Sequence, residues 1–356
     1  MKEVVMLKNF LKACILAGLV MISSFSFAEI TQPYQINKDW QQVLIPNNYH
    51  HKIFIEGEDG SLYMSAVQNN KVVRSFFKYN SNRNEMIFIT HAPDLKFDNF
   101  VVDKLGNIYS YSSGGAMRSK SIMKYSSANQ WQSFYSLIKG ATPERLSIKD
   151  GCLFLLNYLP KYDNRDLLMF DIKTNNNKPM PVFQSNSNFY FYDFAVKDSK
   201  KVFVYGYNHK VNQRQMLELM YKNGKWNPEL VLADVQSNTR MLATQKNLYM
   251  LHEDFGCASK YNFDSKLHSN YEILEGFDLD ALQTDAAENV YFGGRGFDYE
   301  PSAVFKVSHN SNRLVQVGGR MIDQEGKPEN KPISNLTIIN NVIYASINGN
   351  LYKYQQ

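Results

Sequence analysis

One aromatic residue, flanked by short apolar segments, recurs seven times along this chain of 356 residues. The recurring positions are Tyr63, Tyr109, Phe154, Phe203, Tyr249, Tyr291 and Tyr344. Neighbouring positions are 42 to 53 residues apart, which is the period of a four-stranded propeller blade. Within each repeat, runs rich in Tyr, Phe, Val and Ile alternate with Asn, Gly, Asp and Ser clusters, a pattern typical of strands and turns. The sequence therefore predicts an all-β, seven-bladed β-propeller of four-stranded antiparallel blades.

The last repeat ends at Gln356, directly after its third strand, so its fourth strand must come from elsewhere. The N-terminal segment 38–42 (KDWQQ) reads like segment 129–132 (NQWQ), where a fourth strand begins in the second repeat. We therefore expect the N-terminal strand, within residues 36–46, to join the last blade and close the ring. Closure of this kind removes sheet edges that would otherwise pair with other chains.

The repeat positions also predict the domain organisation. Residues 29–356 form one propeller domain, which is long enough to bury a large core. The expected blades span approximately residues 51–91, 93–138, 141–184, 185–233, 234–276, 277–320, and 332–356 together with 36–46.

Residues 1–28 have the pattern of a signal peptide. Three lysines precede an apolar run over residues 13–22, which is too short to span a bilayer, and the segment ends in Ser26-Phe27-Ala28. We expect cleavage before Glu29 and export to the periplasm or the cell exterior. The alternative is an uncleaved N-terminal anchor. After cleavage, the sequence offers no segment of transmembrane length.

Charge and cysteine content limit the partners. The leader holds three lysines and one glutamate, so the whole-chain net charge of +5 becomes +3 after cleavage. Such a small excess gives no indication of a nucleic-acid partner. Cys152 and Cys257 fall in the third and fifth repeats, too far apart for a disulfide, and we expect two free thiols.

Several residues resemble the kelch repeat of galactose-oxidase-type propellers. The second repeat combines Gly114-Gly115 with Tyr125 and Trp131, Gly293-Gly294 forms a second glycine doublet, and Trp40 and Trp226 repeat the tryptophan. In kelch blades these residues are structural, so the resemblance implies a fold rather than a reaction. Galactose-oxidase copper chemistry needs a matched Tyr, Cys and His set that is not found here, and we expect no cofactor. Propeller families with an Asp-x-x-Gly-Asn-x-Tyr turn, like residues 103–109, remain alternatives.

Ligand sites are expected on one face of the ring. Because strands alternate in direction, the loops between second and third strands emerge beside the loops between blades, around the mouth of the central channel. The candidate ligand-binding residues of these loops are Arg295, Tyr299, Arg118, Arg214 and His252. A small excess of Lys and Arg on this face favours an anionic ligand, although solvated loops are the simpler interpretation. The histidines lack the spacing of a metal site, so we expect no metal.

The innermost strands carry a second group of charged residues at the same end. It consists of Glu144, Arg145, Arg240, Asp278 and Asp280, with Arg145 and Arg240 as further ligand-binding candidates. Carboxylates and arginines in one channel could perform acid/base chemistry on a sugar. They could equally hold water.

These features favour a non-catalytic binding or scaffold propeller, which presents its loop-rich face to a partner protein or a cell-surface glycan. We assign no catalytic residue. The alternative is a carbohydrate-active enzyme, a sugar mutarotase or an oxidase-like protein that works at the channel mouth. The kelch resemblance is the reason for considering this alternative. The oligomeric state is left open.

Overall fold

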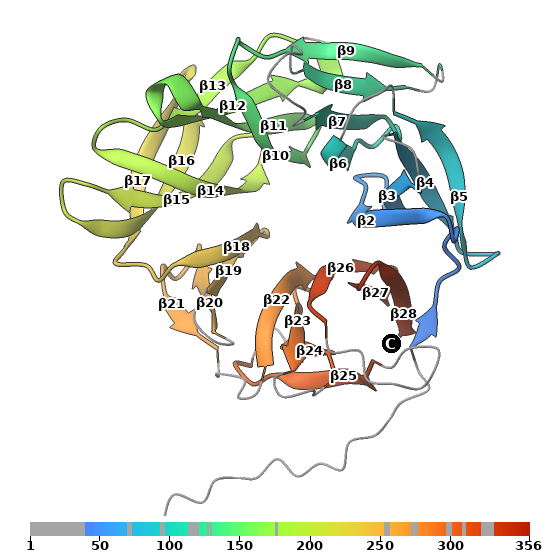
Figure 1. Cartoon of the computed structure of the whole chain (residues 1–356). Coiled ribbons are helices and arrows are strands. Elements are labelled where there is room, and N and C mark those ends of the chain that lie inside the picture. The colour runs from blue at the N-terminus through green and yellow to red at the C-terminus, as the bar shows by residue number, and fades with distance from the viewer. Residues whose placement is uncertain are drawn as a thin grey trace, which may run out of the picture. The chain divides into compact units, whose positions relative to one another are not determined.

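Seven four-stranded antiparallel sheets surround a common centre, as the repeats predict (Figure 1). The computed structural model describes residues 40–69, 73–92, 97–112, 121–126, 128, 130–174, 177–252, 257–271, 277–296, 301–307, 311–321 and 331–356. The fold is an all-β, seven-bladed propeller, and the predicted fold class is confirmed. The leader lies outside the described residues.

Each blade is numbered from its innermost strand outward. Blades 1 to 3 are β2 (Tyr49–Glu56), β3 (Leu62–Gln68), β4 (Arg74–Asn80) and β5 (Glu85–His91); β6 (Phe97–Val102), β7 (Ile108–Ser112), β8 (Ser121–Tyr125) and β9 (Trp131–Ser136); and β10 (Thr142–Lys149), β11 (Cys152–Leu159), β12 (Asn164–Asp171) and β13 (Met180–Gln184). Blades 4 and 5 are β14 (Phe189–Asp198), β15 (Lys201–Asn208), β16 (Gln213–Lys222) and β17 (Lys225–Ala233); and β18 (Asn238–Ala243), β19 (Asn247–His252), β20 (Ala258–Asn262) and β21 (His268–Asn270). Blades 6 and 7 are β22 (Phe277–Thr284), β23 (Val290–Gly296), β24 (Ala303–Val307) and β25 (Val315–Arg320); and β26 (Ile333–Ile339), β27 (Val342–Ile347), β28 (Asn350–Gln355) and β1 (Gln41–Gln42).

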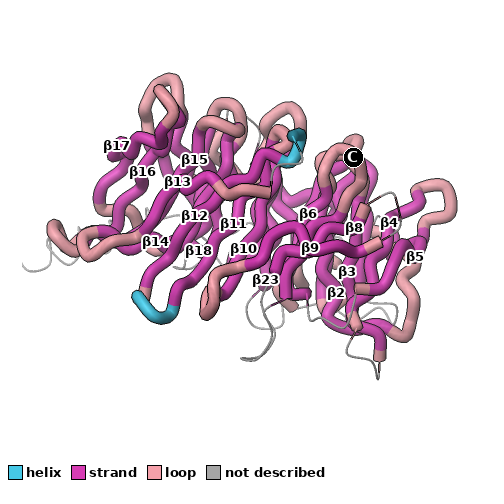
Figure 2. Tube along the Cα trace, turned by 90° about the horizontal axis from the view of Figure 1, so that it is seen from above, coloured by secondary structure: helices cyan, strands magenta, loops and turns pink. Residues whose placement is uncertain are grey.

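Helical structure is confined, among the described residues, to two single turns in blade 3. They are η1 (Pro160–Tyr162), between β11 and β12, and η2 (Ile172–Thr174), between β12 and β13, and both are drawn in cyan in Figure 2. None of the helices in the described part of the chain has the length and apolar character needed to span a membrane.

The recurring aromatics form the core. All seven are at most 6% exposed, and they pack in clusters that combine residues of neighbouring blades. In blade 2 the Tyr109 hydroxyl donates to Asp103 Oδ2 (3.2 Å), while Asp103 Oδ1 accepts from the backbone N–H of Asn107 (2.9 Å). Blade 6 repeats this arrangement with Asp285 and Tyr291 (2.9 Å). The aspartate of this turn therefore supplies a hydrogen-bond acceptor to the buried tyrosine hydroxyl. This explains why polar turns accompany the buried tyrosines.

The N-terminal strand closes the ring, as predicted. Gln41 pairs with Lys353 of β28, and β1 lies beside the C-terminal strand in Figure 1. The chain then continues toward blade 1, where the Leu44 N–H donates to Asn84 O and Leu44 O accepts from the Met86 N–H, both at 3.1 Å. The segment therefore connects the outer edges of blades 7 and 1.

Gly293 allows blades 6 and 7 to approach closely. A Cβ at this position would lie 2.7 Å from Ile333 Cγ2 and 3.1 Å from Ala281 Cβ, closer than side-chain atoms normally come. Gly293, of the doublet Gly293-Gly294, therefore has a structural role in the packing of blade 6 against blade 7. The other doublet, Gly114-Gly115, lies outside the described residues.

Candidate functional site

Every innermost strand has a break in its pairing near its beginning. The residues skipped by the ladders are His51 with Lys52, Asp98, Glu144, Tyr192, Thr239, Asp280 and Ser334. A β-bulge of this kind leaves one residue unpaired and redirects the strand locally. The innermost strands surround the centre of the ring (Figure 1). We call the end at which they begin the mouth; the bulges repeat there around the ring.

Arg145 follows the bulge of β10 and reaches blade 4. Its Nη1 donates to Asp193 Oδ1 in a short ion pair and to Phe194 O at 3.2 Å. The guanidinium also lies over the Phe194 ring, 5.1 Å from its centroid. These contacts hold Arg145 between two innermost strands, with its side chain partly exposed.

Glu144, the bulge residue itself, is held by Arg165 of β12. Arg165 donates from Nε to Oε2 (2.6 Å) and from Nη2 to Oε1 (3.1 Å), which is the two-pronged geometry favoured between guanidinium and carboxylate. The same guanidinium lies 5.0 Å from the ring centroid of Tyr190. Glu144 is therefore a paired carboxylate.

Arg240 reaches past a neighbouring blade. It lies in β18 of blade 5, and its Nη2 donates to Ser334 O of blade 7 at 3.2 Å. Arg240 is accessible to solvent, yet the surrounding protein lowers its pKa by desolvation, and the positive charge of Arg145 adds to this. The charges of Asp280 and Asp193 act in the opposite direction. The pKa starts so high that Arg240 keeps its charge.

Asp280 differs from the other carboxylates of the mouth. Burial, followed by the charge of Asp278, raises its pKa to about 6, although Arg295 and Arg240 oppose the change. Its Oδ2 is buried and accepts no hydrogen bond from the described residues. Asp278 instead forms an ion pair with Arg295, at 2.9 Å. These side chains make up the mouth cluster, which consists of Glu144, Arg145, Arg165, Asp193, Arg240, Asp278, Asp280 and Arg295.

The structure brings some of the predicted site residues together and separates others. Arg145, Arg240 and Arg295 belong to the mouth cluster. Arg214 lies exposed at the start of β16, the third strand of blade 4. His252 is buried, with its Nε2 2.8 Å from Ser259 Oγ in the same blade. Two further predicted residues, Tyr299 and Arg118, lie outside the described residues.

The sequence missed Asp193 and placed Arg295 in a loop. Asp193 occupies the position after the bulge in β14, as Arg145 does in β10 and Arg240 in β18, so an alignment of the repeats could have found it. Arg295 lies in β23, which continues to Gly296 because the ladder with β22 extends to the mouth.

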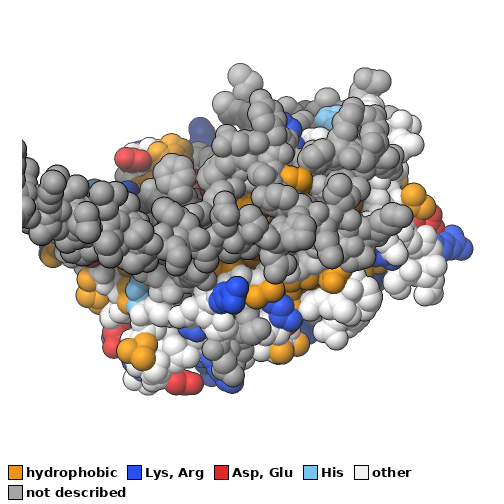
Figure 3. All heavy atoms as spheres, turned by 90° about the horizontal axis from the view of Figure 1, so that it is seen from below, with side chains coloured by type: hydrophobic (Ala, Val, Ile, Leu, Met, Phe, Trp, Pro, Cys, Tyr) orange, Lys and Arg blue, Asp and Glu red, His pale blue; other side chains and the backbone are white. Residues whose placement is uncertain are grey.

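Charge at the surface is mixed. On the side drawn in Figure 3, lysine and arginine side chains (blue) are interspersed with apolar and acidic ones. Within the described part of the chain, no group of three His, Cys, Asp or Glu side chains is arranged to hold a metal ion. Cys152 and Cys257 lie in blades 3 and 5 and are not joined by a disulfide.

Comparisons with known proteins support the fold. No family profile matches the sequence, and no curated protein matches it either. Among solved structures, an oligogalacturonate lyase from Vibrio parahaemolyticus superposes with a TM-score of 0.66 at 8% identity, over 90% of this chain and 96% of that one. An inactive virginiamycin B lyase from Staphylococcus aureus, solved with quinupristin, gives a TM-score of 0.61 at 9% identity, over 89% and 99%.

A WD40 propeller is similar to the chain as well. The WD40 propeller domain of Doa1 superposes with a TM-score of 0.56 at 12% identity, over 90% of this chain and 98% of that domain. Identities this low are evidence for the propeller fold alone. The fold therefore does not decide between catalysis and binding, and the kelch resemblance stays a hypothesis.

Proposed function

We propose that this chain is an exported, kelch-like binding propeller, which presents its mouth to an anionic partner: an acidic protein surface or a carboxylated cell-surface glycan. The observation that supports binding is the pairing of the mouth carboxylates. Asp193, Glu144 and Asp278 each face an arginine. A carboxylate whose oxygen already accepts a hydrogen bond from a guanidinium is engaged in that ion pair rather than directed at a substrate. The arrangement therefore suits recognition by preformed arginines better than acid catalysis.

Rigid support strengthens this proposal. Arg145, Arg240 and Arg295 all lie on strands rather than on loops, and their guanidinium groups are held by carboxylate or carbonyl oxygens. Guanidinium groups fixed in this way lose little conformational freedom when they bind an anion.

The binding test uses an array of carboxylated and neutral glycans, followed by affinity measurement on the best ligand. We expect acidic glycans to bind, and Arg295→Ala to cost about 1–3 kcal/mol, as for a charge-assisted hydrogen bond. His268→Ala is the control, because β21 lies at the outer edge of blade 5. Equal binding of neutral and acidic glycans by wild type, or loss of binding in the His268 variant alone, would contradict the proposal.

A second candidate function is a carbohydrate-active enzyme that uses Asp280. The specific observation is a carboxyl in the neighbourhood of Arg240 whose pKa is raised to about 6 and whose Oδ2 accepts no hydrogen bond from the described residues. A group with this pKa exchanges protons readily near neutral pH. NMR detection of anomer exchange or bond cleavage in acidic sugars tests this candidate. Turnover that is lost in Asp280→Asn while binding persists would favour the enzyme over the binding protein.

Export is a separate part of the proposal, supported by the leader pattern of residues 1–28. N-terminal sequencing of envelope or secreted material should start at Glu29 or within a few residues of it. Full-length protein recovered from the cytosol alone would contradict export.

A further inference from the structure

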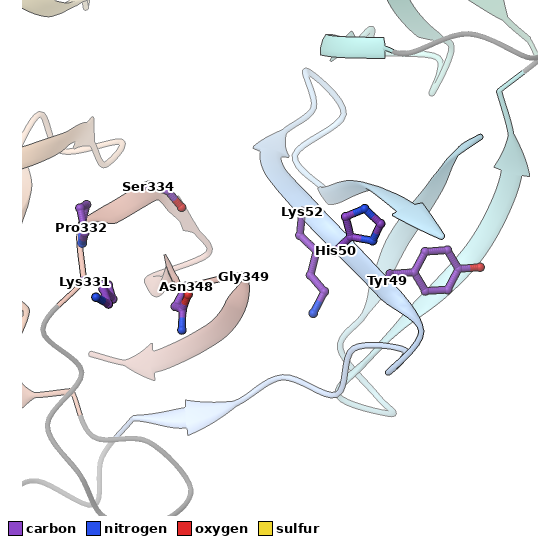
Figure 4. Close-up of a pocket in the computed structure, with 8 residues that line it drawn as sticks. All are labelled: Tyr49, His50, Lys52, Lys331, Pro332, Ser334, Asn348 and Gly349. Carbon is purple, nitrogen blue, oxygen red and sulfur yellow. The ribbon is translucent and has the colours of Figure 1, made fainter. Parts of the chain in front are cut away.

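A pocket of about 540 Å³ opens at the seam where blade 1 meets blade 7. One wall, on β2, carries Tyr49, His50 and Lys52 (Figure 4). The other wall belongs to blade 7 and consists of Lys331, Pro332, Ser334, Asn348 and Gly349. No member of the mouth cluster lines this seam pocket, although Arg240 bonds to the Ser334 carbonyl beside it.

Each wall contains a residue of an innermost strand. Lys52 and Ser334 are bulge residues of β2 and β26, and the Ser334 hydroxyl lies 3.2 Å from the Ser346 carbonyl oxygen. The Asn335 amide donates to Phe54 O of β2, which connects the two innermost strands across the seam. The pocket is therefore a fixed feature of the closed ring.

A tight turn completes the wall of blade 7. Asn348 and Gly349 connect β27 to β28 with positive φ angles of 50° and 75°. This pair of left-handed residues is typical of a two-residue hairpin. The Lys52 chain lies close to this turn, because a Cβ added to Gly349 would be 4.0 Å from Lys52 Cδ.

The charge of the seam pocket is unbalanced. Its described lining includes two lysines and a histidine but no aspartate or glutamate. At the mouth, by contrast, Arg145, Arg165 and Arg295 each have a carboxylate partner. Neither Lys52 nor Lys331 forms an ion pair with any carboxylate of the described residues.

Lys52 is also partly desolvated. Burial lowers its pKa from the ordinary value, because an ammonium loses hydration without gaining a counter-charge. An anion in the seam pocket would supply this charge to Lys52.

We propose that the seam pocket binds the carboxylate or phosphate group of a small anionic solute, with Lys52 and Lys331 donating from opposite walls. Its volume falls within the range of about 300–1,000 Å³ that is usual for small-molecule sites. Ser334 and Asn348 add neutral polar groups that orient the rest of the solute. This site goes beyond the proposed function and does not depend on it.

Binding across the seam has a structural consequence. Blades 1 and 7 are far apart in sequence and meet only when the ring closes, so a ligand that contacts both walls binds the closed state alone. Such a ligand stabilises the folded protein in proportion to its occupancy. Anion binding should therefore raise the melting temperature as well as give a direct binding signal.

The test titrates the intact protein with inorganic phosphate, with glucuronate and with neutral glucose, using calorimetry and thermal unfolding. We expect saturable binding and thermal stabilisation by at least one of the two anions, and neither from glucose. Lys52→Met and Lys331→Met should each weaken the affinity about 10-fold or more, as for loss of a charge-assisted contact. Methionine keeps the apolar stem of each lysine, so folding should be preserved. Lys225→Met, on the exposed outer strand β17, is the matched control and should bind like wild type.

The outcomes separate clearly. Preference for phosphate or for glucuronate identifies which anionic group the seam pocket selects. The proposal is overturned if neither anion binds, if glucose binds equally well, or if both lysine variants fold and bind like wild type. Because Lys331 is exposed, its substitution gives a readable result even if Lys52→Met is unstable.

Discussion

The indole of Trp40 lies 5.4 Å from the ring of Tyr354, between centroids, with the two planes inclined by 40°. The same contact, at 5.4 Å in both cases, recurs within two other blades in the pairs Trp131–Tyr125 and Trp226–Tyr221. Trp40, at the start of the described chain, therefore occupies in blade 7 the position that a tryptophan of the fourth strand occupies in blades 2 and 4. Closure of the ring uses the same aromatic contact as the interior of a blade.

Replacement of Trp40 by alanine should weaken the closure selectively. We expect the free energy of unfolding to fall by about 2–4 kcal/mol, as for loss of a large, partly buried aromatic. Trp226→Ala is the matched control, because it removes the same contact from a blade formed by one continuous segment. Denaturant unfolding measures both losses. Limited proteolysis should cleave the N-terminal segment faster in the Trp40 variant alone, and equal cleavage in both variants would contradict this prediction.

Removal of residues 29–46 should open the ring. The deletion eliminates β1 and the backbone bonds from Val43 and Leu44 to the edges of blades 7 and 1. We expect the melting temperature to fall by roughly 10 °C or more, because several kcal/mol of packing and hydrogen bonding are lost. A peptide of residues 36–46 added in trans should restore part of the loss. An unchanged melting temperature would show that the N-terminal strand contributes little to closure.

Gly293→Ala and Gly294→Ala should differ in their effect on stability. A Cβ at Gly293 would be 2.7 Å from Ile333, whereas the nearest atom to a Cβ at Gly294 is Phe305 Cε2, at 3.2 Å. We expect Gly293→Ala to cost about 1–3 kcal/mol by overpacking between blades 6 and 7, and Gly294→Ala to cost less. Thermal unfolding of the two variants measures the difference. Equal stability would mean that blade 7 moves away at little cost.

Asp280→Asn should stabilise the protein above about pH 6 and have no effect near pH 4. The pKa of Asp280 is raised from 3.8 to about 6, so the folded state binds a proton more tightly than the unfolded state does. The wild-type protein therefore loses stability as the pH rises from 3.8 to about 6, and the asparagine variant does not show this loss. Because Asp280 is partly solvated, we expect a gain of about 1 kcal/mol.

Unfolding free energies of Asp280→Asn and wild type, compared between about pH 4 and pH 7.5, test this sign. Asp193→Asn is the control, because it removes a carboxylate that is already paired with Arg145 and does not contribute to the pKa of Asp280, and it should give no gain. A gain that is largest at acid pH would contradict the assignment.

The repeats predicted the architecture well because they reflect local chemistry. Tyr109 and Tyr291 are each preceded by an aspartate six residues earlier and by an asparagine two residues earlier, and Trp40 carries the local pattern of Trp131. The contacts of the candidate site were harder to predict from the sequence, because they depend on β-bulges and on the register of strand pairing. Asp193 meets Arg145 only because both innermost strands shift their pairing just before these residues.

His252 illustrates the same limit. Its position next to a loop suggested a ligand contact, but the side chain is buried next to Ser259. The two strands that carry these residues pair along their length, and that pairing decides which side chains point inward. No local sequence pattern distinguishes this histidine from one that faces solvent.

The closing strand imposes an order on folding. Gln41 lies in the first described strand to be synthesised, yet its partner Lys353 belongs to the last of the described strands. Six blades can assemble from contacts within continuous segments, whereas the seventh must wait for the two ends of the described chain to meet. Contacts of such large sequence separation form late and slow the final step. Until then the outer edge of β28 is exposed, and molecules that meet at this stage could exchange their first strands and become linked dimers.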